Sequence, residues 1–154
     1  MPTRVVITGE GSSGMSSRFF LDTDVIVYSF DASIPFKQKK AQELIAEALS
    51  AGTGVVSSQV VQEFLHIALK KFKVPLALSD AREYCEKVLF PLCEVFPGYD
   101  FFLGALDVKE RSGVSIDDAL IIQAALTADC PTLYSEEIKE GLKLFNMTVK
   151  NPFR

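Results

Sequence analysis

Seven acidic residues in four short segments are the side chains of this chain whose types and spacing could do chemistry. Carboxylates within about 4 Å of one another repel by ~4 kcal/mol per pair at an effective dielectric near 20. No lysine or arginine stands inside any of the four segments. Either these acids stay apart, or they share a hard divalent cation. They are Asp22, Asp24, Glu63, Asp117, Asp118, Glu136 and Glu137.

The ligand chemistry of these segments favours magnesium or manganese. Oxygen ligands without cysteine or histidine select Mg²⁺ or Mn²⁺ over Zn²⁺. The lone histidine, His66, and the three cysteines lack the spacing of a zinc site. A hard cation held by carboxylates polarises a phosphate, activates water and stabilises the departing oxygen. The natural substrate for such a site is a nucleic-acid phosphodiester.

Each acidic segment also has a purely structural explanation. Asp22 follows an apolar run typical of a buried strand and could simply cap the next turn. Glu63 lies between the apolar and polar faces of a predicted helix, where a solvated glutamate is ordinary. In the other two segments a serine, Ser115 or Ser135, precedes the acids as a helix N-cap would. A functional site therefore requires that all four segments converge.

Short apolar runs alternate with longer helical patterns after residue 17, which is typical of βαβ units and a parallel sheet. We therefore predict an α/β fold. Because ligands bind at the carboxyl ends of parallel strands, acids at strand-to-helix junctions can meet although they are far apart in sequence. The predicted strands are 18–22, Gly54–Ser57, Cys93–Phe96, Thr132–Tyr134 and Met147–Lys150.

The helical patterns are bounded by capping and helix-breaking residues. The last of them is apolar on nearly every side, so we expect it to be buried. The predicted helices are Phe36–Ala51 ended by Gly52, Ser58 to about Phe72, one capped by Asp80 and ended by Pro91, one capped by Asp100 and ended near Gly113, and Ile116–Ala128 opened by Ser115.

The composition is that of one globular domain, residues 18–154. Hydrophobic residues make up 48% of the chain and charged residues 23%. No apolar run approaches the ~20 residues that a membrane span requires. Residues 1–17 are rich in glycine and serine without a signal-peptide core, and we interpret them as a flexible extension or a cloning remnant. The odd number of cysteines and the missing signal indicate a reducing cytoplasm.

The net charge of −4 argues against a nucleic-acid partner, but the distribution of charge provides local basic surface. Two lysine clusters lie in the predicted helices, one near the start of the first and one near the end of the second. We predict that these clusters line the approach of an RNA backbone. The lysines are Lys37, Lys39, Lys40, Lys70, Lys71 and Lys73.

The order and the residue types of the acidic segments resemble the motifs of the PIN-domain ribonucleases, and most closely those of the VapC-type toxins of bacterial toxin–antitoxin systems. The resemblance covers about residues 18–152 and rests on segments 20–28, 57–64, 118–121 and 133–138. It implies a three-layer α/β/α sandwich around a parallel sheet. It also implies Mg²⁺- or Mn²⁺-dependent endoribonuclease activity, frequent homodimers, and inhibition by a small antitoxin protein.

Site residues follow from this resemblance position by position. It implies four catalytic, metal-binding acids, with supporting polar residues around them. Position 24 is often asparagine in the family and the fourth acid is usually aspartate, so this chain departs at both places. The implied metal-binding acids are Asp22, Glu63, Asp118 and Glu137. The supporting residues are Thr23, Asp24, Ser135 and Glu136, the last being the rival of Glu137 as fourth acid.

Two other functions compete with this interpretation. The segment Asp22–Asp24 also resembles the nucleophile motif of haloacid-dehalogenase-type phosphatases, in which the first aspartate attacks phosphate covalently. That family expects threonine or valine where Ile26 stands, and an acidic pair after a strand, whereas Asp117 and Asp118 are predicted to open a helix. The second competitor is a non-catalytic PIN-like module that binds RNA or protein, against which the presence of all four acids argues.

Overall fold

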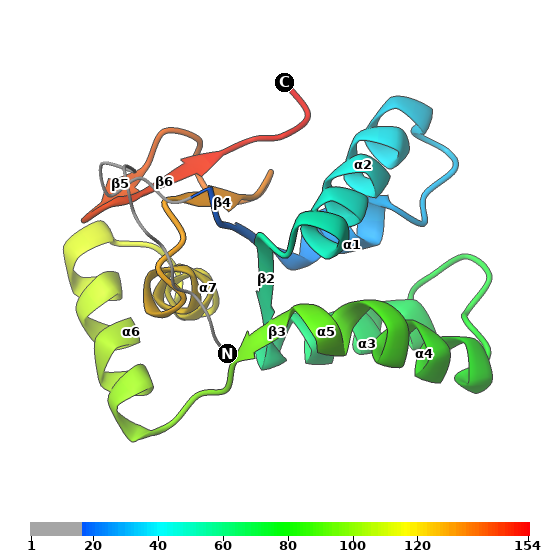
Figure 1. Ribbon diagram of the computed structural model, residues 1–154. Helices are drawn as coiled ribbons and strands as arrows, with labels where there is room; N and C mark the ends of the chain where they lie inside the picture. Colours follow the sequence, from blue (N-terminus) through cyan, green and yellow to red (C-terminus); the bar gives the residue numbers. More distant parts are fainter. Residues whose placement is uncertain (1–16) are drawn as a thin grey trace.

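A six-stranded sheet forms the centre of the protein in the computed structural model, which describes residues 17–154 (Figure 1). The predicted extension, residues 1–17, thus lies outside the described residues except for Ser17. Three of the five predicted strands are confirmed at both ends, and the other two are shorter by a residue or two. The strands are β1 (Phe19–Leu21), β2 (Gly54–Ser57), β3 (Cys93–Val95), β4 (Thr132–Tyr134), β5 (Lys143–Leu144) and β6 (Met147–Lys150).

The sheet order is β3-β2-β1-β4-β6-β5, and all neighbouring strands are parallel except β5 and β6. From β1 the chain steps outward to β2 and β3, and then returns to β4 on the other side of β1. Because strand crossovers are right-handed, this reversal places the helices before β3 on one face and those after it on the other. The predicted three-layer α/β/α architecture is confirmed.

The helices form two groups, one on each face of the sheet, as the reversal of the strand order requires (Figure 1). Those of the first group precede β3, and those of the second follow it. A π-helical turn, η2 (Cys85–Leu89), interrupts the first group. The helices are α1 (Thr23–Tyr28), α2 (Pro35–Ala51), α3 (Ser58–Lys70), α4 (Leu78–Tyr84), α5 (Phe90–Leu92), α6 (Tyr99–Ser112) and α7 (Ile116–Thr127).

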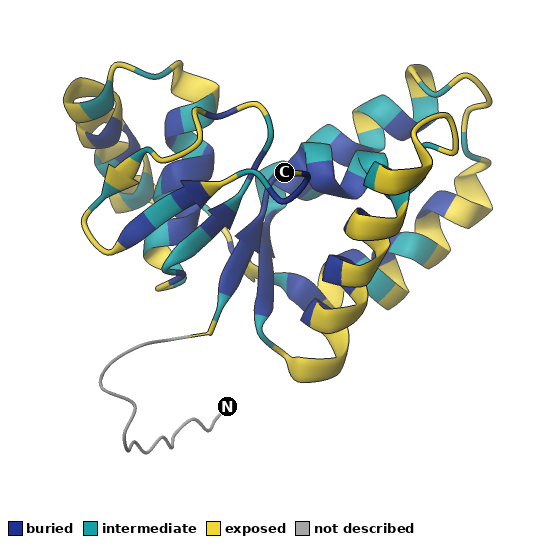
Figure 2. Cartoon of the chain, turned by 90° about the horizontal axis from the view of Figure 1, so that it is seen from above, coloured by how far each residue is buried: buried dark blue, intermediate teal, exposed yellow. Residues whose placement is uncertain are grey.

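The core lies between the sheet and the helices on either side. Every residue of β1 and β2 is buried, and α7 buries five of its twelve residues, as its apolar sequence predicts. Figure 2 shows the buried residues concentrated in the central strands and on the helix faces turned toward them. None of the helices in the described range is long and apolar enough to span a membrane. The cysteines are all free thiols, two buried and one half-buried.

Both predicted ends of the helix assigned to Asp80–Pro91 are wrong. The helix predicted to be capped by Asp80 begins at Leu78, and Asp80 lies in its first turn. Its helical course also continues past Pro91 to Leu92, because at η2 the Phe90 N–H donates to the Cys85 carbonyl, one residue farther back than in an α-helix. That shift in register accommodates a proline that would otherwise clash with the preceding turn.

The next helix shows the same error at its start. Asp100 was predicted as the cap of α6, but Gly98 occupies that position and Asp100 lies in the first turn. The acid favours the positive end of the helix dipole from either position, so the sequence pattern does not distinguish them. Neither the six-residue helix α1 nor the two-residue strand β5 was predicted.

Gly54 tests the packing of α2 on the sheet. A Cβ at this position would lie 2.1 Å from the Cβ of Ala48, so the helix could not keep its present distance. We expect Gly54→Ala to lower the free energy of unfolding by about 3 kcal/mol. Gly98→Ala is the matched control, since its Cβ meets nothing within 4 Å, and should change it by less than about 1 kcal/mol. Urea unfolding of both variants measures the difference, and equal values would contradict this packing.

Candidate active site

The four acidic segments meet at the carboxyl edge of the sheet, where β1 and β4 lie side by side and the chain direction across the sheet reverses. This reversal is where open α/β sheets bind their ligands. A cleft of about 830 Å³ opens there. Its lining includes all seven acids of the four segments: Asp22, Asp24, Glu63, Asp117, Asp118, Glu136 and Glu137.

Asp22 is the most deeply buried of these acids, with 5% of its surface exposed. It is the N-cap of α1, and its Oδ1 accepts a hydrogen bond from the Thr23 N–H at 2.7 Å. Its Oδ2 accepts one from the Ser135 hydroxyl at 2.8 Å. Burial, and then the charge of Asp24, raise the pKa of Asp22 well above its usual range, although both hydrogen bonds oppose this. A cation bound beside Asp22 would favour its charged form and lower this pKa.

Asp24 lies two residues farther on, in the first turn of α1, and its carboxylate is hydrogen-bonded to the turn after β4. Its Oδ2 accepts hydrogen bonds from the backbone N–H groups of Glu136 at 2.9 Å and Glu137 at 3.1 Å. Its Oδ1 is buried and has no partner among the described residues. Burial raises its pKa to about 6, with the nearby charges of Glu137 and Glu136 adding to the effect. A buried, unpartnered carboxylate oxygen is costly unless a cation or water binds it.

Glu63 connects α3 to Thr23, the residue between the two acids that follow β1. The Thr23 hydroxyl donates to Glu63 Oε1 at 2.5 Å, and the Gln59 side chain donates to its Oε2 at 3.0 Å. Gln59 also donates to the Asp117 carbonyl at 3.3 Å, which links α3 to the start of α7. Glu63 is therefore turned into the cleft, and not outward as a merely solvated residue would be.

Asp118 enters the cleft from the first turn of α7. Ser115 is the N-cap of this helix, as predicted, and its hydroxyl accepts a hydrogen bond from the Asp118 N–H at 3.1 Å. That bond uses the backbone N–H of Asp118, and its carboxylate lines the cleft beside the same serine. Burial raises its pKa, a side-chain hydrogen bond with Ser115 opposes the rise, and the charges of Asp117 and Glu63 add to it. Ser115 thus caps α7, Asp118 also lines the cleft, and the metal-binding role of Asp118 stays a prediction.

The two acids after β4 have different surroundings. Glu136 forms an ion pair with Lys37 and accepts a hydrogen bond from the Tyr28 hydroxyl, and these contacts lower its pKa. Glu137 is exposed, lines the cleft, and makes no side-chain hydrogen bond or ion pair with any described residue. Lys37, predicted for RNA contact, thus lies against an acid. Of the two acids, Glu136 has both carboxylate oxygens in contact with protein groups, and the role of Glu137 as the fourth acid stays a prediction.

Of the other predicted RNA-binding lysines, only Lys71 lines the cleft within the described part of the chain. The others are exposed on α2 and near the end of α3, and their contact with RNA stays a prediction. Tyr28, Gln62 and His66 also line the cleft and were not predicted. Helical spacing places Gln62 and His66 beside Glu63, but nothing in the sequence distinguishes such residues from a solvated face. The remaining lysines are Lys39, Lys40, Lys70 and Lys73.

The donor set fits a hard divalent cation. Within residues 17–154, no three histidine, cysteine, aspartate or glutamate side chains lie close enough to form a ready-made metal site. The carboxylates are nevertheless close enough to raise the pKa values of Asp22 and Asp118, and Asp24 Oδ1 lacks a partner. The seven acids of the cleft offer only oxygen donors, which suits Mg²⁺ or Mn²⁺, and His66 is the one imidazole in the lining.

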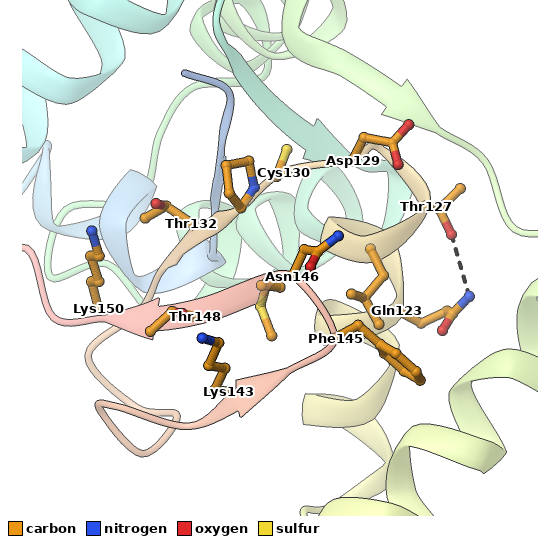
Figure 3. A pocket seen from close by; sticks show the side chains of 13 residues that line it. Gln123, Thr127, Asp129, Cys130, Thr132, Lys143, Phe145, Asn146, Thr148 and Lys150 are labelled. Carbon is orange, nitrogen blue, oxygen red and sulfur yellow. Dashed lines mark hydrogen bonds between the residues drawn. The ribbon is translucent and has the colours of Figure 1, made fainter. Parts of the chain in front are cut away.

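A second hollow, of about 1030 Å³, lies along β6 and the end of α7 (Figure 3). Its lining combines Lys143 and Lys150 with Asp129, together with threonines and amides. The Gln123 amide donates to the Thr127 hydroxyl at its edge. Residues capable of phosphoryl chemistry do not converge in this hollow, so the acidic cleft is the candidate active site.

The fold and the acidic cleft define an α/β protein with a candidate site for metal-dependent phosphoryl transfer at its switch point, where the strand order reverses between β1 and β4. The PIN domain family matches residues 19–138 of this chain, and the chain therefore belongs to that family. This assignment removes the haloacid-dehalogenase alternative. A comparison with curated proteins finds no match.

Several solved structures share the fold. The crystal structure of FitAcB from Neisseria gonorrhoeae has 17% sequence identity and a TM-score of 0.60, over 88% of this chain and 98% of that one. The structure of FitAB bound to an IR36 DNA fragment has 16% identity and a TM-score of 0.60, over 88% and 96%. The crystal structure of VapBC2 from Rickettsia felis, bound to a DNA fragment from their promoter, has 19% identity and a TM-score of 0.55, over 86% and 97%.

The raised pKa of Asp24 predicts how stability depends on pH without metal. Because the folded state holds this proton up to about pH 6 and the unfolded state only to about 3.8, the free energy of unfolding falls as pH rises between these values. We expect Asp24→Asn to be more stable than the parent protein at pH 7, by up to about 3 kcal/mol at 1.36 kcal/mol per pH unit, and to approach it near pH 4.

Urea unfolding in chelator at pH 4 and pH 7 measures this difference. Asp107→Asn, an exposed aspartate on α6, is the matched control and should match the parent protein at both values of pH. Adding Mn²⁺ at pH 7 should stabilise the parent protein more than Asp24→Asn. A loss of stability in Asp24→Asn at pH 7 would show that the charge of Asp24 is compensated without metal.

Proposed function

We propose that this protein is a divalent-metal-dependent endoribonuclease and the toxin of a VapBC-type toxin–antitoxin pair. The observation that carries the proposal is the convergence on one cleft of acids from four separate segments, which are the ends of β1 and β4, the helix α3 and the first turn of α7. Membership of the PIN family supports it, since PIN domains are generally nucleases. Mg²⁺ or Mn²⁺ is the proposed cofactor.

The proposed metal-binding acids are Asp22, Glu63, Asp118 and Glu137. When bound, the cation would polarise the phosphate, activate a water molecule and stabilise the departing oxygen. The protein groups orient the acids for this work: Ser135 and the Thr23 N–H fix the Asp22 carboxylate, and the Thr23 hydroxyl fixes Glu63. Without a cation the negative cleft repels phosphate, so cleavage depends on metal.

The proposed substrate is RNA in single-stranded or looped form, whose splayed backbone can enter an open cleft at the surface. Lys71 lines that cleft and is placed to meet a phosphate beside the acids. Lys70 and Lys73 near the end of α3, with Lys39 and Lys40 on α2, extend the basic approach. We propose that the protein acts on this RNA in the cytoplasm.

The proposed protein partner is a small antitoxin. FitAB and VapBC2, two structures that share this fold, are each bound to DNA fragments. A PIN toxin of this kind would be held inactive by such a partner, and we also propose that it forms a homodimer. The exposed apolar residues on α6 would suit a protein contact, since scattered apolar residues are ordinary but a helical row of them is not. They are Tyr99, Phe102, Leu103 and Leu106.

Asp22→Asn tests the catalytic proposal. We expect it to lower kcat for a fluorescent single-stranded RNA by at least about a hundredfold in Mg²⁺ or Mn²⁺, because a neutral amide binds a cation poorly. Asp107→Asn, the same change on the exposed face of α6, should retain full activity. If the purified protein binds RNA but cleaves neither RNA nor DNA with either metal, the non-catalytic binding module is the better description.

Lys71→Glu tests the approach of the substrate. We expect KM for the same RNA to rise by about three- to tenfold with kcat little changed, because this lysine binds the backbone and not the reacting atoms. The dependence of binding on salt concentration should weaken by about one phosphate contact. Arg82→Glu, an exposed charge reversal on α4, controls for net charge. An unchanged KM and salt dependence in Lys71→Glu would exclude it from the RNA path.

A further inference from the structure

Four residues from distant parts of the chain form a cluster at the rim of the acidic cleft. We call Tyr28, Lys37, Glu136 and Phe153 the rim cluster. The Lys37 ammonium lies 4.7 Å from the centre of the Tyr28 ring and 5.6 Å from that of Phe153. The two rings pack edge to face at 5.0 Å. The cluster thus ties α1, α2 and the C-terminal residues to the turn after β4.

Both oxygens of the Glu136 carboxylate are used within this cluster. Oε1 accepts the Tyr28 hydroxyl hydrogen bond at 2.5 Å, and Oε2 is paired with the Lys37 ammonium. Lys37 also lies within 3.4 Å of the Tyr28 oxygen, which closes a triangle of polar contacts. Only about a quarter of either charged side chain is exposed, so water screens the pair less than it screens a surface ion pair.

The inner side of the same turn holds the acids of β1. The N–H groups of Glu136 and Glu137 both bind Asp24 Oδ2, and the Ser135 hydroxyl binds Asp22 Oδ2. The Ile138 N–H donates to the Ser135 oxygen at 3.1 Å and fixes the orientation of that hydroxyl. Residues 135–138 are therefore anchored from outside through the Glu136 side chain, and from inside they set the positions of two aspartates.

We infer that Glu136 is a positioning residue, which Lys37 and Tyr28 hold at the rim so that the turn keeps its amides on Asp24 and presents Glu137 to the cleft. This inference rests on the proposed function for its catalytic consequence. It separates two adjacent glutamates into one that holds the turn and one that faces the metal. It also gives Lys37 a partner within the protein in place of the RNA phosphate.

The three roles open to these residues predict different kinetics. If Lys37 and Glu136 position the turn, then Lys37→Met and Glu136→Gln each lower kcat by about 10- to 100-fold with KM within about threefold, and the double variant is no worse than the poorer single variant. If Glu136 were a metal ligand, Lys37→Met would free it and leave kcat intact. If Lys37 bound RNA, Lys37→Met would raise KM and Glu136→Gln would not.

Hydrogen exchange of the full-length, metal-free protein provides a readout that does not depend on activity. We expect the amides of Glu136 and Glu137 to exchange at least about tenfold faster in Lys37→Met and in Glu136→Gln, because the turn can leave Asp24. Lys37→Arg should restore both slow exchange and kcat. The matched controls are Lys87→Met and Glu83→Gln, which break an exposed ion pair elsewhere. These controls should exchange and cleave as the parent protein does.

The outcomes are separable from those that test the proposed function. Unchanged exchange in both rim variants, with melting temperatures equal to those of the controls, overturns the positioning role whatever the activity. Faster exchange in a protein that cleaves no RNA retains the positioning role and rejects the nuclease. A melting temperature lowered by many degrees in Lys37→Met but not in Tyr28→Phe or Glu136→Gln assigns Lys37 a general packing role and also overturns the inference.

Discussion

Repulsion among desolvated carboxylates is the constraint on which the rest of this structure depends. Burial and the neighbouring acid raise the pKa of Asp22, and one oxygen of Asp24 is buried without a partner in the described structure. A fold gains nothing from such an arrangement by itself, since replacing buried charges with apolar residues is often neutral or stabilising. The acids therefore indicate a site in which stability is given up so that a cation can be held.

The topology provides the means to hold acids that repel. Asp22 and Ser57 cap the helices that follow β1 and β2, and Ser115 caps α7, so strand ends and helix starts coincide at one edge. The partial positive charges at these helix starts offset some of the negative charge in the cleft. Because the strand order reverses between β1 and β4, the helices before β3 and those after it lie on opposite faces, and the cleft opens between the two groups at this edge. The cleft thus follows from the strand order and not from any single loop.

The strands and the acids could be predicted from the sequence because both leave local signals. Gly54–Ser57 and Thr132–Tyr134 are short apolar runs bounded by turn residues, and their ends were predicted correctly. The helix α1 was missed because Val25, Ile26 and Val27 have the β-branched pattern of a strand, and only the cap at Asp22 starts a helix there. The strand β5 has two residues, too few to give a pattern, and needs Phe145 at a positive φ of 54°.

Glu136 and Glu137 are adjacent but have different surroundings, and this difference could not be predicted from the sequence. The partner of Glu136, Lys37, lies 99 positions away, and no local pattern encodes a pair at that separation. On the sequence alone Lys37 belongs to a basic cluster and Glu136 to an acidic one, and each would be assigned to a different ligand. Once they pair, the backbone between Ser135 and Ile138 has little freedom, since both of its sides are bound. Lys37 and Glu136, which the sequence assigns to RNA and to metal, thus pair with each other and hold the turn that positions the acids of the site.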